Sequence, residues 1–333
     1  MRKSTFVVAA LALLALIVYI GCNIRRQQPQ TQTTPALQKI RVAQFGDLLL
    51  YLPLYIAKHE QVFKRHGLDV EIVSTGGDDK TFAAVLSGDV QFGVADPVFV
   101  AVAAERGERG VVVGMLIDGV PNYGVALSKA LPTIRDPKEL TARTVATVPA
   151  PSTSYALVAR LYQSAGVKPR IYQVSAPGLV PALKSGAADY ALLIEPWVSE
   201  VLEDGGKIGF SLMDYYKHFA LTGITTSRSV ITTDSSVTTR FLAALTESVH
   251  IFYDDESATL KTAEERFPGT PERVLRDAIT RLRRDAIYPK CLTVRQESWQ
   301  ASIDLRREIG DLTRPPKEMA YYVDNRFAQE NCK

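Results

Sequence analysis

Between Ile40 and Pro97 the apolar positions switch repeatedly between two spacings. Short runs of branched and aromatic residues at 40–45, 68–72 and 90–94 predict strands. The segments between them carry apolar residues at helical spacing and end at Gly67 and Gly88, which predicts two helices. Strands separated by single helices favour βαβ units and a parallel sheet.

Ligands of such sheets bind at the carboxyl ends of the strands. In this chain those ends are the loops 46–52, 75–80 and 95–97. In this part of the chain, ligand contacts are therefore expected in these three loops.

The same order of elements returns further along the chain. Predicted strands at 144–148, 171–175 and 190–194 alternate with predicted helices at 155–165 and 179–184. Both halves share one order of features: the end of a helix, then a strand, then a carboxylate followed by proline. This order occurs over Leu86–Pro97 and over Leu183–Pro196. This weak pseudo-repeat predicts two lobes of similar α/β construction.

The expected domain layout follows from these elements. The strand at 123–127 is expected to cross into the second lobe, and the segment 219–225 to return to the first. A mainly helical region ends the chain of 333 residues. We expect a signal peptide at 1–21, a flexible tether at 22–37, the first part of lobe I at 38–124, lobe II at 125–222, and a return to lobe I with C-terminal helices at 223–333.

The N-terminus has the pattern of an export signal. A basic start, Met1-Arg-Lys3, precedes an apolar run of about 15 residues that ends near Cys22. The end of the run resembles a bacterial lipobox, with Gly21 before Cys22, although Tyr19 stands where Leu is usual. Cys22 is thus the predicted lipidation site, and an uncleaved anchor is the alternative. Both place the folded part at the extracytoplasmic face of a membrane or in the periplasm.

Two cysteines remain after such a cleavage, Cys291 and Cys332. An oxidising compartment permits a disulfide between them, and two buried free thiols are the alternative. Their spacing does not form a Cys–Cys metal cluster.

Composition and motifs narrow the function classes. The net charge is +3 and no dense Lys/Arg stripe with interleaved aromatics is present, so nucleic acid is not an expected partner. The chain lacks a Walker loop, a Gly-x-Ser-x-Gly motif and any close pair of histidines. These observations favour a binding protein over an enzyme, with no cofactor and no metal.

Asp96 and Glu195 are the two carboxylates that precede proline in the pseudo-repeat. If the lobes face each other across a cleft, these acids lie at equivalent strand ends on opposite walls. The alternative is that each caps the helix that follows, because proline prefers the first helical position.

At this point the ordered set of short motifs resembles a known family. The motifs are Leu52-Pro-Leu-Tyr-Ile-Ala57, Val62-Phe63, Gly67-Leu-Asp-Val70, Leu86-Ser-Gly-Asp89, Leu140 with Thr144-Val145, Leu183-Lys-Ser-Gly186 and Glu195-Pro196. Over about 39–311 they resemble the periplasmic substrate-binding proteins of ABC importers, in the nitrate, aliphatic-sulfonate and thiamine-pyrimidine group. The resemblance implies a two-lobe, type II-like periplasmic binding protein fold, with mostly parallel sheets, that closes on a ligand by hinge motion.

The chemistry of the strand-end loops favours a nitrogenous heterocycle as ligand. No arginine falls in a predicted cleft loop, and carboxylates repel an anion but accept from ring N–H or amine groups. The resemblance adds that Glu195-Pro196 looks like the pyrimidine-binding branch, where the Glu meets a ring nitrogen. A sulfonate, taurine or nitrate remains the second interpretation. The predicted ligand contacts are Asp47, Tyr51, Thr75, Gly76, Asp96, Tyr123, Ser152, Thr153, Glu195 and Trp197.

The expected role is a lipid-anchored, monomeric solute-binding protein that delivers its ligand to an ABC permease. Two other classes share the fold. One is an enzyme like the relatives that synthesise the pyrimidine, although this chain lacks their cysteine-rich motif. The other is a tethered ligand-sensing domain.

Overall fold

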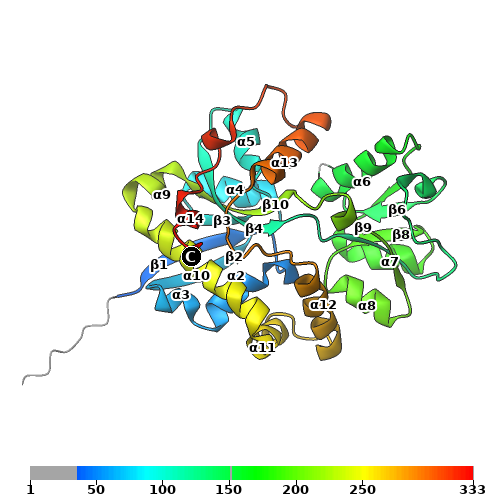
Figure 1. The fold of residues 1–333 in the computed structure, drawn as a ribbon, viewed down its shortest axis with the longest axis horizontal. Helices are drawn as coiled ribbons and strands as arrows, with labels where there is room; N and C mark the ends of the chain where they lie inside the picture. Colours follow the sequence, from blue (N-terminus) through cyan, green and yellow to red (C-terminus); the bar gives the residue numbers. More distant parts are fainter. Residues whose placement is uncertain (1–35, 151, 333) are drawn as a thin grey trace, which may run out of the picture. The chain divides into compact units, whose positions relative to one another are not determined.

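The structure is a computed structural model that describes residues 36–150 and 152–332. The predicted signal peptide, the lipidation site Cys22 and the tether up to residue 35 lie outside the described residues and stay predictions. The compact unit that begins at Leu37 contains the whole fold described below (Figure 1).

The first sheet has five strands in the order β2-β1-β3-β10-β4. Four of them run in the same direction, and β10 is antiparallel to both of its neighbours. The predicted parallel βαβ start of the chain is thus confirmed. The strands are β1 (Gln38–Gln44), β2 (Leu68–Ser74), β3 (Phe92–Ala95), β4 (Gly110–Asp118) and β10 (Ala220–Ser227).

Helices cover both faces of this sheet because its buried residues alternate between two cores. Val42 packs into one core with α2, α3 and α10, whereas its neighbour Ala43 packs into the other with α4, α5 and α13. The single helix expected before Gly67 is divided, since Gln61 has a φ of 56° between α2 and α3. The helices are α2 (Leu52–His59), α3 (Val62–Arg65), α4 (Asp78–Ser87), α5 (Phe99–Ala104), α10 (Ser235–Asp254) and α13 (Gln296–Glu308), with the 3-10 helix η1 (Leu49–Tyr51) before α2.

The second sheet repeats the first in order and direction. Its order is β7-β6-β8-β5-β9, and only β5 runs against the other four. The strands are β5 (Tyr123–Ala126), β6 (Val145–Thr147), β7 (Ile171–Gln173), β8 (Tyr190–Leu193) and β9 (Lys207–Ser211). The helices are α6 (Thr153–Ser164), α7 (Leu179–Lys184) and α8 (Trp197–Glu203), with the 3-10 helices η2 (Pro137–Leu140), η3 (Ala176–Gly178) and η4 (Leu212–Asp214).

The sequence pseudo-repeat corresponds to this repeated topology. Asp96 follows β3 and Glu195 follows β8, and these strands hold the same place in their sheets. The helices before them end at Gly88 and Gly186, which have φ values of 83° and 75° that favour glycine.

Each sheet receives its reversed strand from the chain of the other lobe. β5 enters the second sheet directly after β4, and β10 enters the first sheet after β9 and η4. The expected boundaries at 124/125 and 222/223 fall inside these two strands. The sheet changes instead at 119–122 and 212–219, because a strand pairs along its whole length.

The C-terminal region is helical and packs on the first sheet, in line with the expected return to lobe I. Leu242, Leu245, Val249 and Phe252 of α10 are all fully buried there. The chain ends with the 3-10 helix η5 (Met319–Tyr321) and a short α14 (Arg326–Gln329). The remaining helices are α9 (Arg228–Thr233), α11 (Glu256–Arg266) and α12 (Glu272–Arg284). In the structure a disulfide joins Cys291 to Cys332.

α12 connects the two halves of the fold, although it follows the return to the first sheet in sequence. It contacts α11 on one side and α8 on the other (Figure 1). Within residues 36–150 and 152–332, no helix is both long and apolar enough to cross a membrane.

Candidate ligand-binding cavity

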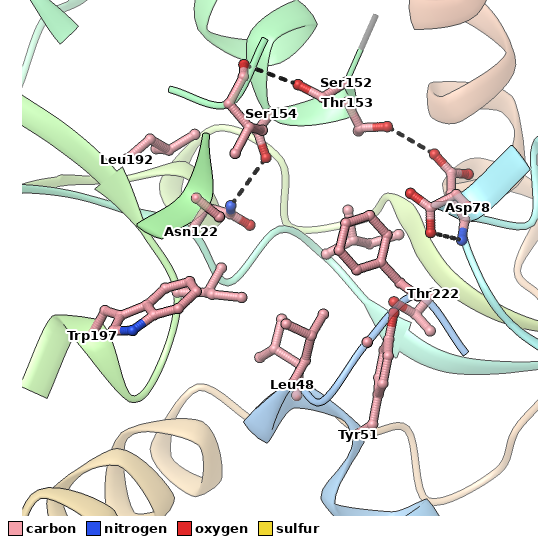
Figure 2. A pocket seen from close by; sticks show the side chains of 18 of the residues that line it. Leu48, Tyr51, Asp78, Asn122, Ser152, Thr153, Ser154, Leu192, Trp197 and Thr222 are labelled. Atoms are coloured by element: carbon pink, nitrogen blue, oxygen red, sulfur yellow. Dashed lines mark hydrogen bonds between the residues drawn. The ribbon is translucent and has the colours of Figure 1, made fainter. Parts of the chain in front are cut away.

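A cavity of about 340 Å³ lies where the strand ends of the two sheets meet (Figure 2). This volume is at the small end of the range for ligand pockets, roughly 300–1,000 Å³. Its lining is mostly apolar, with a few polar side chains on both lobes. The lining residues are Phe45, Gly46, Asp47, Leu48, Leu50, Tyr51, Asp78, Asp96, Leu221 and Thr222 from the first lobe, Asn122 from the connection, and Val148, Ser152, Thr153, Ser154, Ala176, Leu179, Leu192, Ile194 and Trp197 from the second.

The parallel strands explain why these residues meet. Phe45 follows β1, Asp96 follows β3 and Ile194 follows β8 directly. The first residues of α4 and α6, Asp78 and Thr153, come after the loops that leave β2 and β6. Carboxyl ends of neighbouring parallel strands share one edge of a sheet, and here the two edges contribute opposite walls.

Six of the ten predicted contacts line this cavity. They are Asp47, Tyr51, Asp96, Ser152, Thr153 and Trp197. Figure 2 shows Thr153 near Asp78 and Trp197 on the opposite side of the cavity.

Glu195 lies outside the lining, which changes the expectation that it contacts the ligand. Its carboxylate accepts hydrogen bonds from the backbone N–H and the hydroxyl of Ser199, both at 3.1 Å, so it caps α8. Arg281 of α12 donates to it from Nε at 2.6 Å. The side chain is fully buried, and burial raises the pKa of Glu195 despite the arginine. The capping alternative therefore describes its place in the structure.

Three other predicted contacts also lie outside the cavity. The Tyr123 hydroxyl donates to Asp285, which follows α12, and the ring is buried. The Thr75 hydroxyl is held by the backbone oxygens of Gln44 and Gly77, at 3.1 and 3.0 Å. Gly76 makes the turn before α4, with a φ of 79°.

Asp96 both lines the cavity and joins the lobes. Its Oδ1 accepts from the Val98 N–H at 3.0 Å, which caps the next turn. Its Oδ2 accepts from the Thr153 hydroxyl at 2.8 Å and from Arg306 of α13 at 2.9 Å. The two expectations for Asp96, cap and cavity wall, are therefore both realised in one side chain.

The arginines beside the cavity were not found from the sequence. Arg306 pairs with Asp96, Arg281 with Glu195, and Arg266 with the cavity residue Asp47. All three come from C-terminal helices, far in sequence from the strand-end loops, so no local pattern connects them with the site.

Asp78 is the lining carboxylate that sequence reasoning missed. It lies inside the predicted loop 75–80, directly after Gly76-Gly77, and the strand-end rule that selected Thr75 also points to it. Its Oδ1 accepts from the Asp96 N–H at 3.1 Å. Burial and the nearby Asp96 raise the pKa of Asp78 to about 7.

The lining carries acid and hydroxyl groups but no basic side chain among the described residues. Burial, together with Asp78, Tyr55 and Asp96, raises the pKa of Tyr51 far above its ordinary value, so its hydroxyl stays protonated. Across residues 36–150 and 152–332, no cluster of His, Cys, Asp or Glu side chains is arranged to hold a metal ion. The cavity thus offers aromatic faces and hydrogen-bond acceptors.

Comparison with known proteins places the chain in a family. The family model described as "NMT1/THI5 like" matches residues 50–258. The chain belongs to this family. The family-level resemblance seen in the sequence is thereby confirmed.

Solved structures share the two-lobe periplasmic binding protein fold of this NMT1/THI5-like chain. A ligand-binding component of an ABC-type import system from Staphylococcus aureus, with zinc bound, aligns with a TM-score of 0.70 at 15% identity, covering 88% of this chain and 99% of that one. The alkanesulfonate-binding protein SsuA from Xanthomonas axonopodis pv. citri, bound to MOPS, aligns with a TM-score of 0.68 at 16% identity, over 87% of this chain and 99% of that one. The expected fold class is confirmed.

A curated relative matches over a shorter stretch. The putative binding protein YtlA of Bacillus subtilis (strain 168) is 43% identical to this NMT1/THI5-like chain over 51 residues. The match spans 15% of the length of either protein.

Proposed function

We propose that this protein is the solute-binding component of an ABC importer. It captures a small nitrogenous heterocycle in the cavity between the lobes and delivers it to a membrane permease. The observation that carries the proposal is the cavity itself, which is small, lies at the strand ends of both sheets and draws its walls from both lobes. Two walls that move on a hinge suit capture and release of a solute.

The lining favours a flat ring that donates hydrogen bonds. Phe45, Tyr51 and Trp197 offer aromatic surface in the lining, and Figure 2 shows Trp197 on the side opposite the acceptor Asp78. A ring nitrogen or exocyclic amine satisfies such a carboxylate, whereas a sulfonate or nitrate repels it.

A small anion is the second candidate, and one feature supports it. Ser152, Thr153 and Ser154 line the cavity at the N-terminus of α6, a place that suits anions. The Ser152 hydroxyl already donates to the Val148 carbonyl, and Thr153 already donates to Asp96. The available donors are therefore fewer than the position alone indicates.

A binding role is also preferred over the enzyme and sensor alternatives. The hydroxyls at the start of α6 have structural partners: Thr153 donates to Asp96, which Arg306 holds in an ion pair, Ser152 bonds to backbone groups, and Ser154 accepts from Asn122. An Asp96 carboxylate compensated in this way is a poor general base for Thr153. A sensor domain shares the same cavity, and a permease partner distinguishes the two. Export, attachment through Cys22 and a monomeric state belong to the proposal as well.

The test is a thermal-shift panel on the mature domain after native mass spectrometry has shown it to be free of ligand. Ligand binding to the native state raises the melting temperature by mass action. We expect aminopyrimidines to raise it and nitrate, taurine and alkanesulfonates not to. Trp197→Ala should abolish the shift, while Tyr172→Ala, which removes an exposed aromatic ring of the second lobe, should not.

Two outcomes contradict the proposal. A shift with anions only assigns the cavity to the second candidate. Conversion of a panel compound, seen as a change in its mass after incubation, makes the protein an enzyme.

A further inference from the structure

The three carboxylates that line the cavity differ in how their charges are compensated. Arg266 pairs with Asp47, and the amide of Gln44 also donates to Asp47 at 2.8 Å. Arg306 pairs with Asp96, which also receives the Thr153 hydroxyl. These two acids therefore have their countercharges within the protein.

Asp78 differs from the other two acids. Among the described residues it takes part in no ion pair, and its hydrogen bond is the one from the Asp96 N–H to Oδ1 at 3.1 Å. Its second oxygen is available to the cavity, which it lines from the first turn of α4. The charge of Arg306 lowers the pKa of Asp78 without forming an ion pair with it, but burial and the charge of Asp96 outweigh this effect. The carboxylate therefore gains from a partner of opposite charge that arrives in the cavity.

Stabilisation of the helix α4 alone does not explain why an acid stands at position 78. An acid in the first turn of a helix is stabilised by the helix dipole, and Asp78 and Asp79 share this place. Asp79 meets that preference while exposed to solvent. Asp78 instead faces the cavity, where Figure 2 shows it across from Trp197.

We infer that Asp78 selects a ligand with a protonated nitrogen. The nitrogen pairs with the Asp78 carboxylate while the ring of the ligand lies against Trp197 on the opposite side of the cavity. This inference rests on the proposed solute-binding function and narrows its substrate class to cationic heterocycles such as ring-bearing amines. Hydrogen bonds between an ammonium group and a carboxylate are about twice as strong as neutral ones, so the charge gives selectivity as well as affinity.

Binding of such a ligand is linked to protons. Because the pKa of Asp78 is raised to about 7, much of the ligand-free protein carries a neutral Asp78 below that pH. A cation favours the ionised form, so its binding releases a proton and strengthens as pH rises through this region. A neutral ligand gains less from the ionised form, so its binding depends more weakly on pH through Asp78.

The experiment compares two probes of the same shape in which a protonated amine in one replaces a neutral hydroxyl in the other. They are 4-amino-5-aminomethyl-2-methylpyrimidine, an amine, and its 5-hydroxymethyl counterpart, an alcohol. Isothermal titration calorimetry at pH 5.5, 7 and 8 measures both probes on the unmodified mature domain, on Asp78→Asn and on the matched control Asp79→Asn. Benzylamine and benzyl alcohol serve as a second pair, in case the pyrimidine substituents do not fit.

We expect the amine of at least one pair to bind at least tenfold more tightly than its alcohol at pH 8. Its affinity should rise at least fivefold from pH 5.5 to 8. Asp78→Asn should remove both differences, and Asp79→Asn should keep them. A thermal melt of each variant confirms that it is folded.

Three results overturn the inference. They are equal binding of amine and alcohol, equal effects of the two Asn variants, and no binding of either amine. If neutral heterocycles or anions still bind in the cavity, the solute-binding function stands and only the cationic class is lost. If no compound of the thermal-shift panel binds either, the solute-binding function and the cationic ligand class are both refuted.

Discussion

Removing Arg306 should destabilise the protein strongly, because its buried partner loses its countercharge. The side chains of Arg306 and Asp96 are only 2% and 5% exposed, and their ion-pair distance is 2.9 Å. Arg306 also donates to the Thr153 hydroxyl at 2.7 Å, across the boundary between the lobes. Arg306→Met keeps much of the apolar stem but leaves Asp96 without its cation.

The expected loss follows from this burial. Breaking a buried ion pair by removing one partner costs about 3–5 kcal/mol. With about 2 °C per kcal/mol for a chain of this size, the melting temperature should fall by about 6–10 °C. The exposed neighbour Arg307 provides the control, since Arg307→Met should change the melting temperature by less than about 1 °C.

A double-mutant cycle shows whether the loss comes from the unpaired acid. Asp96→Asn in the Arg306→Met background removes the uncompensated charge and should recover part of the stability. Thermal melts at pH 7.5 measure all four proteins. A fall below about 2 °C for Arg306→Met, or no recovery in the double variant, refutes the reasoning.

Three further predictions use other contacts. Cys332→Ser should lower the free energy of unfolding by up to about 4 kcal/mol in the chain-entropy model, because the disulfide to Cys291 spans 41 residues. Denaturant titration with and without reductant measures this loss. Equal unfolding curves for the unmodified protein and the variant without reductant would contradict it. Asp78→Asn should stabilise the ligand-free protein by about 1–3 kcal/mol at pH 8 and very little at pH 4.5. The reason is that the raised pKa of Asp78 makes the unmodified protein lose stability as the pH rises from about 4 to about 7, and the variant lacks this loss. Thermal melts of both proteins between pH 4.5 and 8 test the sign. Trp197→Phe should keep most of the heterocycle affinity that Trp197→Ala loses, and calorimetry showing equal loss in both would remove stacking as its role.

Much of the fold was predictable because it follows from short-range patterns. The alternation of strand and helix signals before Pro97 gave β1, β2, β3 and α4, and the pseudo-repeat gave the second lobe. The helix expected before Gly67 is broken because Gln61 has a positive φ, and glutamine at this position does not predict such a conformation.

The cavity was predictable only where it lies in strand-end loops. This rule reached Asp96 and Thr153, and Asp78 lay within a loop it had selected. It could not reach Arg306 or Arg281, since tertiary packing alone brings α13 and α12 to the site.

The two carboxylates of the pseudo-repeat show this limit most clearly. They hold equivalent places in sequence and topology, yet Asp96 lines the cavity and Glu195 does not. The difference lies in the arginine partners and in the cap of α8, both of which depend on the assembled structure.

The most direct test of the account is a crystal structure of the mature domain with the heterocyclic amine that gives the largest thermal shift. The account predicts electron density in the cavity between the two sheets, with the ring against Trp197 and a nitrogen within hydrogen-bond distance of the Asp78 carboxylate. A ligand bound elsewhere on the protein, or an anion held by the hydroxyls of Ser152 to Ser154 in its place, would contradict it.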